Sequence, residues 1–522
     1  MDMATEYDVI VIGGGITGAG TARDCALRGL RTLLVERGDI ADGASGRNHG
    51  LLHSGARYAM TDRESAEECI RENRILRRIA SNCVEETDGL FITLPEDDLA
   101  YQKRFVESCR KAGIPAKELD PADARRLEPS VNPALIGAVR VPDASVDPFR
   151  LTSANILDAC MHGADVLTYT EVLSLIVEGG GVQGVNLCDK RTGEKRTFRG
   201  RLVVNAAGIW SQRIASMAGA SITMFPAKGA LLIYGHRVNH MVINRCRKPS
   251  NADILVPGDV VTVIGTTSDR VPFEECDHMK VTPEEVRILQ DEGNKLAPAL
   301  SSTRILRAYA GVRPLVASDD DPTGRSISRG IVLLDHAGRD GIDNFLTITG
   351  GKLTSYRLMA QKATDLVCRK LGVKAVCTTD KRPLPGSEPN FRLPKGAPTA
   401  LKTAVGRHGS MVSRMDFEKG ADVVCECEQV SRAEIEYAVK YLGVKNLQDL
   451  RRRTRMGMGT CQGSFCIAGA ATALSEALGT PERRDDLLRE YLQERWKGMI
   501  PVCWGDTLRE AEFMRKRYGY EI

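Results

Sequence analysis

Hydrophobic positions gather in this chain into short β-branched runs that end in glycine or other small residues and are followed by helical spacing. The first such stretch is residues 9–28, VIVIGGGITGAGTARDCALR. Residues 201–211 (RLVVNAAGIWS) and 345–360 (FLTITGGKLTSYRLMA) repeat the order of strand, small residues and helix. Three such junctions, far apart in the sequence, predict one discontinuous α/β domain with other segments inserted between its parts.

The first junction has the spacing of a dinucleotide-binding turn. Gly13-x-Gly15-x-x-Gly18 follows the strand and opens the helix, and the next apolar run, residues 32–35, ends at Glu36. The glycines allow a tight turn and close approach to a pyrophosphate, which lies at the positive end of the helix dipole. Glu36 can accept hydrogen bonds from the adenosine ribose. The pattern predicts NAD(H) or FAD, and its place near the N-terminus favours FAD.

The other two junctions and the Gly/Ser-rich stretch 43–58 (GASGRNHGLLHSGARY) provide further candidate contacts to the same cofactor. Backbone N–H groups in such stretches suit phosphates and a flavin ring, and a helix that begins after GGK can point its N-terminus at the flavin carbonyls. The additional candidate cofactor-binding residues are Ser45, Asn48, Leu52, Ala207, Gly208, Gly350, Gly351 and Lys352.

The chain has 522 residues, too many for one compact core, and its composition divides it into four regions. We assign residues 1–385 to an FAD-dependent oxidoreductase domain and the Pro- and Gly-bearing stretch 386–420 to a linker. Residues 421–475 form a small helical cysteine module, and residues 476–522 form C-terminal helices. Within the first region, we expect a Rossmann-like cofactor-binding part at residues 7–90, 146–220 and 325–385. An inserted α+β substrate part is expected mostly at residues 90–145 and 220–325.

Composition indicates an ordinary globular enzyme, with 42% hydrophobic and 27% charged residues. Lys and Arg total 72 against 68 Asp and Glu, and this net charge of +4 is too small to indicate a nucleic-acid partner. The chain shows no secretory signal and no run of 18 apolar residues, so we expect a cytoplasmic protein that does not itself span a membrane. Most of the 15 cysteines lie singly in apolar or helical surroundings, as reduced cytosolic thiols do.

Four cysteines depart from that scatter: Cys425-x-Cys427 and, after 33 residues, Cys461-x₄-Cys466. Helical spacing between the pairs predicts four thiolates on two loops, which can hold a zinc ion or a [2Fe–2S] cluster. The spacing departs from the usual C-x₂-C pairs of zinc sites, and disulfides do not suit a reducing cytosol. A cluster would let the two electrons of a reduced flavin leave singly toward a partner protein, whereas zinc would make the module a structural clip.

The motifs and their order resemble the FAD-dependent glycerol-3-phosphate dehydrogenases. The segments that carry this resemblance are IGGGITGAGTARDCALRG, GRNHGLLHSGARY, VPDASVDPFRLT, NAAGIW, IGTTS, AGVRPL and ITGGKLTSYRLMA. Within that family, VNPALIGAV, RCRKPSNADILVPGD and the appended cysteine module resemble the A subunits of the anaerobic enzymes. The module itself is similar to bacterioferritin-associated ferredoxin in its GMG-x-CQG-x₂-C segment, which implies a [2Fe–2S] cluster on the four cysteines.

The resemblance implies oxidation of sn-glycerol 3-phosphate to dihydroxyacetone phosphate by hydride transfer to FAD. Arginine suits the phosphate because its planar fork donates paired hydrogen bonds, and His53 is the first choice for general base because its free pKa lies near working pH. Lys352 would stabilise negative charge on the reduced flavin or orient the substrate. The candidate catalytic residues are His53, Arg57, Tyr58, Thr267, Arg313, Arg329 and Lys352.

The resemblance also implies partners: a second soluble subunit, together with a membrane-anchoring iron–sulfur subunit that passes electrons to quinone in anaerobic respiration. The chain would then lie peripherally at the inner face of the cell membrane. Two other interpretations stay open. Amine or amino-acid dehydrogenases share the glycine junctions and the cysteine module, and arginine attracts a carboxylate as well as a phosphate. The second interpretation is a non-catalytic FAD/iron–sulfur electron-transfer subunit, although the presence of His53, Arg57 and Arg313 together argues against it.

Overall fold

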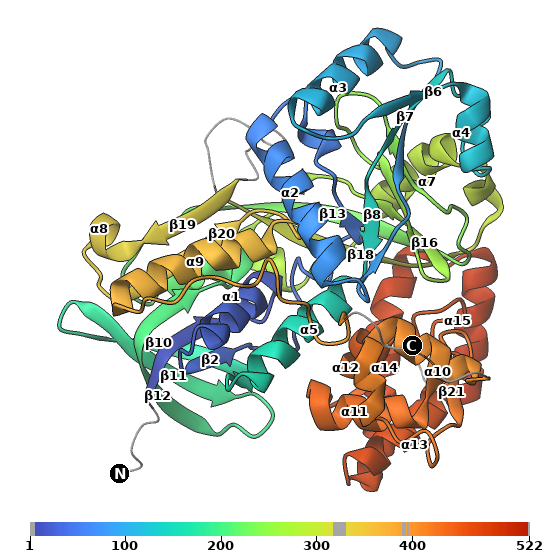
Figure 1. The fold of residues 1–522 in the computed structure, drawn as a ribbon. Coiled ribbons are helices and arrows are strands. Elements are labelled where there is room, and N and C mark those ends of the chain that lie inside the picture. Colours follow the sequence, from blue (N-terminus) through green and yellow to red (C-terminus); the bar gives the residue numbers. More distant parts are fainter. Residues whose placement is uncertain (1–5, 317–329, 389–392, 394–395, 520–522) are drawn as a thin grey trace.

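The computed structural model describes residues 6–316, 330–388, 393 and 396–519. Figure 1 shows three regions: a first sheet with helices against it, a second sheet with its own helices, and a helical C-terminal region in orange and red. Helices of the C-terminal region contact both other regions. The predicted fold class, an α/β cofactor domain with an inserted α+β part and a helical cysteine module, is confirmed.

The first sheet brings the glycine junctions together. Its strands are β1 (Glu6–Ile12), β2 (Thr32–Val35), β9 (Asp165–Leu167), β10 (Thr170–Glu178), β11 (Gly181–Asp189), β12 (Lys195–Asn205), β19 (Ile331–Asp335) and β20 (Phe345–Gly350). Its main path is β10-β11-β12-β1-β2-β9, and β20 pairs with both β12 and β19. Asn205 lies beside Ile12 and Thr347 in parallel pairs. Because parallel strands end at one edge of a sheet, the three junctions meet there.

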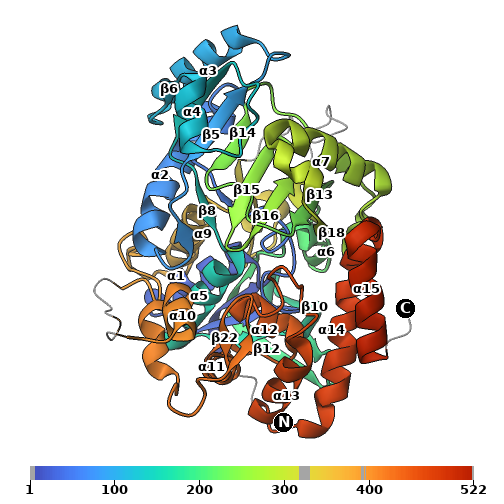
Figure 2. The same ribbon diagram turned by 90° about the vertical axis from the view of Figure 1, so that its right-hand side faces the viewer.

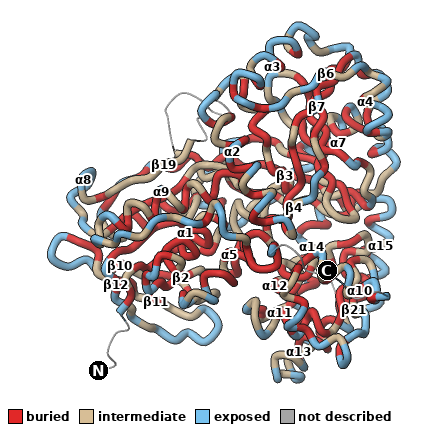
Figure 3. The backbone as a smooth tube through the Cα atoms, in the orientation of Figure 1, coloured by how far each residue is buried: buried red, intermediate tan, exposed pale blue. Residues whose placement is uncertain are grey.

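The apolar run in β1 is continuous because both faces of the strand are covered. Val9 and Val11 pack with α1 (Ile16–Leu27), α5 (Pro148–Met161) and α9 (Tyr356–Leu371). Ile10 and Ile12 pack on the other face with residues of β10 and β11. Strands buried on both faces are typical of parallel sheets, and Figure 3 shows this region as largely buried.

The second sheet lies above the first in Figure 2 and is mostly antiparallel. Its strands are β5 (Gly89–Thr93), β6 (Lys117–Leu119), β7 (Gly137–Val141), β13 (Met224–Tyr234), β14 (Val242–Arg245), β15 (Ile254–Gly258), β16 (Val261–Gly265), β17 (Asp269–Arg270) and β18 (Ile305–Val316). The helices in these stretches of the chain are α2 (Arg63–Ile79), α3 (Leu99–Lys111), α4 (Pro121–Leu127) and α7 (Pro283–Leu296). A core that includes Leu232, Ile264 and Leu289 joins this sheet to α7.

Shorter elements complete these two regions. A small sheet contains β3 (Leu51–Leu52), β4 (Val84–Glu85) and β8 (Ala144–Val146). The short helices α6 (Ser211–Ser216) and α8 (His336–Asp340) follow β12 and β19, respectively.

The C-terminal region is helical, as the apolar spacing predicts. It contains α10 (Thr399–His408), β21 (Val423–Cys425), β22 (Val430–Ser431), α11 (Arg432–Leu442), α12 (Leu447–Thr454), α13 (Ile467–Ala477), α14 (Arg484–Met499) and α15 (Gly505–Tyr518). Gly443, where the helical spacing breaks, ends α11 in a left-handed conformation at φ 66°.

Part of the stretch interpreted as a linker is structured. Within 386–420, α10 packs Ala404 into a core with Tyr437 of α11. Arg407 of α10 also pairs with Glu434 at 2.6 Å. The apolar spacing of this helix is only about two turns long and follows a Pro- and Gly-rich stretch, so it is a weak helix signal in the sequence.

None of the helices in the described residues is long and apolar enough to cross a membrane. None of the 15 cysteines forms a disulfide in the structure.

Candidate functional site

The glycines of the first junction allow α1 and the sheet to approach closely. A Cβ on Gly13 would lie 2.6 Å from the carbonyl oxygen of Ala206 in the second junction. A Cβ on Gly18 would overlap the carbonyl oxygen of Gly13, so only glycine allows this packing. Gly15 is the N-cap of α1 and provides no side-chain cap. A helix N-terminus that starts in close-packed glycines has the donors a pyrophosphate needs, so these residues fit a dinucleotide.

Glu36, at the end of β2, braces the same turn. Its carboxylate accepts the Gly14 N–H at 2.6 Å and the Gly38 N–H at 2.8 Å. Burial raises the pKa of Glu36, while these two backbone donors act in the opposite direction. Each carboxylate oxygen has a second lone pair, so Glu36 can still accept a ribose hydroxyl.

The 43–52 stretch is held against the start of α1. Ser45 Oγ accepts the Ile16 N–H at 2.9 Å. The Asn48 side chain donates to the Ser45 carbonyl at 2.7 Å, and the Asn48 carbonyl accepts the Tyr309 hydroxyl of β18 at 2.8 Å. Leu52 is fully buried in β3. In the structure Ser45 and Asn48 therefore shape the loop, and Leu52 anchors it in a core.

The second and third junctions lie beside each other through their strands. The Asn205 side chain accepts the Ala207 N–H at 3.3 Å, and Gly208 has φ 59°. Gly350 and Gly351 have φ 74° and 64°, a conformation that favours glycine. α9 begins only at Tyr356, so a short turn separates GGK from the expected helix. Its N-terminus does not directly follow the glycines.

His53, Tyr58 and Lys352 lie together beside the third junction. The ring centroids of His53 and Tyr58 are 5.5 Å apart, and Lys352 Nζ lies 4.7 Å from the Tyr58 centroid. Lys352 Nζ also donates to Ser65 Oγ at 2.9 Å, and the His53 N–H donates to Thr354 Oγ1 at 3.2 Å. Because a tyrosine face attracts a cation, Tyr58 connects the proposed base and the lysine.

Arg313 belongs to β18, a strand that contacts β20 next to the third junction. Its guanidinium donates to the Thr267 carbonyl at 2.9 Å, to Ser268 Oγ at 3.1 Å and to the Thr266 hydroxyl. These oxygen acceptors hold the planar fork in one orientation.

Thr267 has a different position from the one expected. Its hydroxyl is buried, accepts the Ala230 N–H at 2.9 Å and donates to Glu285 at 3.1 Å. Thr267 therefore supports Arg313 through its carbonyl, and its side chain fixes the loop. Arg329 lies outside the described residues.

Arg57 is already ion-paired. Its guanidinium contacts Asp253 at 3.1 Å, and the same buried carboxylate pairs with Arg247 at 2.8 Å. Arg57 therefore connects the His53 stretch to the loop before β15.

Sequence reasoning missed two residues that hold the His53 stretch. Asn73 of α2 donates to the backbone carbonyls of Leu52 and His53 at 3.1 and 3.3 Å. Asp143 accepts the Ser54 N–H at 2.7 Å, and burial raises its pKa. Asp143 lies in VPDASVDPFRLT, one of the segments that carry the family resemblance, but the resemblance gives this residue no role. No sequence motif around Asn73 indicates its contact with the His53 stretch.

The four clustered cysteines converge, as their spacing predicts. Cys466 is hydrogen-bonded to Cys461 and to Cys425. These bonds lower the pKa of Cys461 to about 5 and also lower the pKa of Cys425, whereas they raise the pKa of Cys466. Burial raises the pKa of Cys427, which also contacts Cys461. In the described part of the chain, no three His, Cys, Asp or Glu residues surround one metal-ion position. The sulfur atoms instead form a chain of neighbours.

Backbone amides also point at these sulfur atoms. Those of Gly457 and Glu428 bond to Cys425, and those of Phe465 and Gly463 bond to Cys461. Donors to thiolate sulfur stabilise the negative charge of a cluster site, so the residues present fit a [2Fe–2S] group.

Comparison with known proteins matches two separate parts of the chain to two families. Residues 8–357 match the family described as FAD dependent oxidoreductase, and residues 423–476 match the BFD-like [2Fe-2S] binding domain. The chain is 60% identical over 520 residues to the A subunit of the anaerobic glycerol-3-phosphate dehydrogenase of Haemophilus influenzae, covering 98% of this chain and 92% of that protein. It is 61% identical over 519 residues to the Escherichia coli K12 protein of the same name, covering 98% and 96%.

The chain belongs to the FAD-dependent oxidoreductase family, among the A subunits of anaerobic glycerol-3-phosphate dehydrogenase.

Solved structures share the fold. The glycerol-3-phosphate dehydrogenase of Bacillus halodurans, complexed with FAD, has a TM-score of 0.71 at 24% identity and covers 96% of each chain. Glycine oxidase of Geobacillus kaustophilus has a TM-score of 0.59 at 22% identity and covers 74% of this chain and 100% of its own. The predicted cofactors, FAD and a [2Fe–2S] cluster, are confirmed by the family, which also decides between cluster and zinc.

In this protein, arginines of α12 and the turn after it clamp the cluster module onto the rest of the chain. Arg453 binds Asp39 with two hydrogen bonds of 2.6 and 2.9 Å, and Arg452 contacts the same carboxylate at 3.0 Å. Although burial raises the pKa of Asp39, the two arginines lower it to about 2. Arg455 contacts Asp259 at 2.9 Å. The run RRRTR, residues 451–455, is visible in the sequence as a cluster of charge between the cysteine pairs, but nothing local predicts its ion-pair partners.

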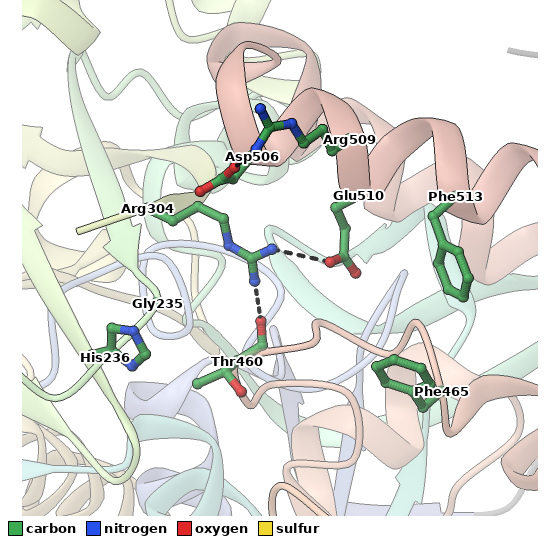
Figure 4. Close-up of a pocket in the computed structure, with 9 residues that line it drawn as sticks. All are labelled: Gly235, His236, Arg304, Thr460, Phe465, Asp506, Arg509, Glu510 and Phe513. Carbon is green, nitrogen blue, oxygen red and sulfur yellow. Dashed lines mark hydrogen bonds and ion pairs between the residues drawn. The ribbon is translucent and has the colours of Figure 1, made fainter. Parts of the chain in front are cut away.

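An open pocket of about 600 Å³ lies beside the cysteine loop (Figure 4). Thr460 and Phe465, which directly precede Cys461 and Cys466, form one side of it, and α15 forms another. Arg304 crosses the pocket to bond the Thr460 carbonyl at 2.7 Å and Glu510 at 3.0 Å. This contact ties the residue directly before β18 of the second sheet to the cluster loop.

Proposed function

We propose that the chain is the catalytic subunit of an anaerobic respiratory glycerol-3-phosphate dehydrogenase. It oxidises sn-glycerol 3-phosphate to dihydroxyacetone phosphate. The observation that carries this proposal is the identity of about 60% to such A subunits over 98% of the chain, which includes both the flavin region and the cysteine module. The grouping of His53, Tyr58 and Lys352 beside the third junction, with Arg313 on the adjoining β18, supports it.

The residues of the site divide the work. Arg313, oriented by the oxygen atoms around it, binds the phosphate, with Arg57 and Arg329 as further candidates. His53 receives the proton of the C2 hydroxyl. Lys352, held over Tyr58, provides positive charge near the third junction. FAD, when bound, supplies the two-electron acceptor for the C2 hydride.

The cysteine module provides the electron exit. A [2Fe–2S] cluster takes one electron at a time, so it suits transfer from a two-electron cofactor to one-electron carriers. We propose two partners: a second soluble subunit, together with a membrane-anchoring iron–sulfur subunit that reduces quinone. The present chain would then lie at the inner face of the cell membrane through these partners.

Rapid mixing of the oxidised protein with glycerol 3-phosphate alone tests the substrate. We expect the flavin absorbance to bleach. Bleaching only by an amino acid or an amine would instead identify the chain as an amino-acid or amine dehydrogenase. The fold is compatible with that activity, because a glycine oxidase shares it. No bleaching by any of these substrates would support a non-catalytic electron-transfer subunit.

A further inference from the structure

An ion pair between β13 and α7 is buried at the second sheet. Lys228 of β13 contacts Glu285 of α7 at 2.8 Å, and their side chains are only 9% and 7% exposed. The cost of desolvating two charges offsets much of their attraction, so a buried pair is weak evidence for stability. The contacts of this pair instead connect it to Arg313.

Both partners of the pair are connected to the Arg313 guanidinium through a backbone carbonyl. Glu285 Oε1 accepts the Thr267 hydroxyl at 3.1 Å, and the Thr267 carbonyl accepts from Arg313 Nη2 at 2.9 Å. Lys228 is connected directly, because its own carbonyl accepts from Arg313 Nη1 at 3.3 Å. The two terminal nitrogens of the fork are therefore bonded to residues that share Glu285 as a partner.

Glu285 is itself held in place by the start of α7. Glu285 and Thr282 form a capping box, in which Glu285 Oε2 accepts the Thr282 N–H at 2.8 Å. The cap uses only this contact of the carboxylate, so the bond between Oε1 and Thr267 is additional to it. Lys228 Nζ also donates to the Lys280 carbonyl at 2.8 Å, so both charged groups have fixed positions.

Close packing also limits where the Arg313 fork can lie. A Cβ on Gly229 of β13 would lie 2.8 Å from Arg313 Nη2 and 3.1 Å from Thr266 Cβ. A glycine at this position therefore leaves the room that the guanidinium occupies. A fork that is already ordered loses less conformational entropy when it binds an anion, and this preorganisation increases affinity.

We propose that Glu285, with Lys228, is a positioning residue for the phosphate of the substrate. It acts only through Arg313, whose two terminal nitrogens it holds in a fixed arrangement for the paired acceptors of a phosphate. Without the carboxylate, Thr267 loses the acceptor of its hydroxyl and Lys228 loses its counter-ion, so the two carbonyls no longer hold the fork in one orientation. The proposal deepens the proposed function and rests on Arg313 as the phosphate ligand.

Substrate kinetics and product binding of the FAD-loaded full chain test this proposal. In Glu285→Gln the amide has one acceptor oxygen in place of two, so it cannot serve both Thr267 and Lys228. We expect KM for glycerol 3-phosphate to rise about tenfold while kcat changes less than about twofold, because substrate and transition state make the phosphate contact equally. The dissociation constant of dihydroxyacetone phosphate, measured from the absorbance of the oxidised flavin without turnover, should rise by the same factor. FAD content should not change.

A double-mutant cycle with Arg313→Ala separates positioning from a general effect on folding. Arg313→Ala alone should weaken binding of dihydroxyacetone phosphate at least as strongly as Glu285→Gln does. The two changes together should weaken it no further, because no fork is left to orient. Thr267→Val removes the connecting hydroxyl at similar volume and should reproduce the effect of Glu285→Gln. Glu284→Gln, at the exposed neighbouring carboxylate that pairs with Arg287, is the matched control and should behave as wild type.

Three outcomes would overturn the proposal. One is wild-type affinity in both Glu285→Gln and Thr267→Val while Arg313→Ala loses affinity. Another is an equal further loss when Glu285→Gln is added to Arg313→Ala, which would show that Glu285 acts independently of the guanidinium. The third is loss of FAD or of soluble protein in both Glu285→Gln and Thr267→Val, which would make the network a folding element. A failure of glycerol 3-phosphate to bleach the wild-type flavin is a different result, since it contradicts the proposed function before any variant is measured.

Discussion

The flavin region and the cluster module solve the problem of holding a redox group in opposite ways. In the flavin region, segments more than 300 residues apart meet because β1, β12 and β20 are parallel neighbours, and close-packed backbone forms the cradle. In the module, four side chains from residues 425–466 converge on two loops of one small helical unit. The first site depends on a whole sheet, and the second depends on local structure.

The difference extends to how each site is joined to the rest of the molecule. The flavin cradle belongs to the core of its domain, where hydrophobic burial holds it. The module is held in part by ion pairs, such as Arg453 with Asp39. Removal of one partner from a buried ion pair strongly destabilises the contact region, because the remaining charge stays buried without a counter-ion. We therefore expect changes in the cradle to remove a cofactor, and changes in the clamp to separate two intact cofactors.

The largest expected effect comes from filling the cradle. In Gly15→Val, a branched side chain enters the space at the start of α1, where its Cβ would already lie 3.1 Å from Ser45 Oγ. The purified variant should contain no FAD and should keep wild-type iron and sulfide. Gly338→Val, at a helical glycine with no atom within 4 Å of the added Cβ, is the control and should stay yellow. Full FAD content in Gly15→Val would contradict the proposal that the glycine turn at the start of α1 binds the FAD pyrophosphate.

The converse experiment removes the second cofactor alone. Cys461→Ser should lose the cluster, because a hydroxyl is a poor replacement for a thiolate ligand. The flavin should still bleach with glycerol 3-phosphate and reoxidise with a two-electron dye, while transfer to the partner proteins and quinone falls to background. Cys503→Ser, in the same C-terminal region but outside the cluster, should behave as wild type. Quinone-linked turnover at the wild-type rate in Cys461→Ser would show that the module is not the exit.

Breaking the clamp should leave both cofactors bound. Arg453→Ala leaves the buried Asp39 without its bidentate partner, which costs about 3–5 kcal/mol. Hydrogen exchange should become faster in α12 and in the loop that carries Asp39. Electron transfer from flavin to cluster should slow, with FAD, iron and sulfide unchanged. Arg432→Ala, which breaks the pair with Glu476 inside the module, is the matched control. Unchanged exchange in Arg453→Ala would mean that packing alone docks the module.

The same contrast explains how far the sequence can predict this molecule. The glycine junctions and the four cysteines are visible because each site demands a residue type at a fixed spacing, and they indicated both cofactors. The clamp was not visible, because Asp39 and Arg453 lie 414 positions apart and nothing local distinguishes their pairing from two solvated surface charges.

Individual roles were harder to predict than cofactors. Thr267 and Arg57 lie in the expected motifs, yet the Thr267 hydroxyl is bonded in the interior and Arg57 is paired with Asp253. A motif selects a segment, and only the packing decides which of its side chains can reach a substrate. The catalytic roles of His53, Arg313 and Lys352 stay predictions.

A smaller effect is expected for the substrate phosphate. Arg313→Ala removes a charge-assisted contact worth about 1.5–3 kcal/mol, which corresponds to roughly 10- to 150-fold in kcat/KM for glycerol 3-phosphate. FAD content should not change. Arg126→Ala, at an exposed arginine of α4, is the control. Wild-type kinetics in Arg313→Ala would exclude Arg313 as a phosphate ligand.

The smallest expected effect is a pH dependence of the clamp. Asp449 of α12 accepts the Tyr169 hydroxyl at 2.5 Å, and burial, with the nearby Asp39, raises its pKa to about 7. In the unfolded chain its pKa is about 3.9, so the folded protein holds the additional proton between about pH 4 and pH 7. The stability that this proton provides is therefore lost as the pH rises through 7. Asp39, whose pKa is lowered to about 2, stays ionised throughout this range.

Hydrogen exchange in α12 measures this dependence. In the wild type, the free energy of opening should be about 1 kcal/mol larger at pH 6 than at pH 8, after correction for intrinsic exchange. In Asp449→Asn the side chain cannot titrate, so this difference should disappear while both cofactors remain. An equal difference in the variant would mean that another group near the clamp titrates instead of Asp449. Loss of the difference would assign it to Asp449, a side chain in the contact between the flavin region and the cluster module.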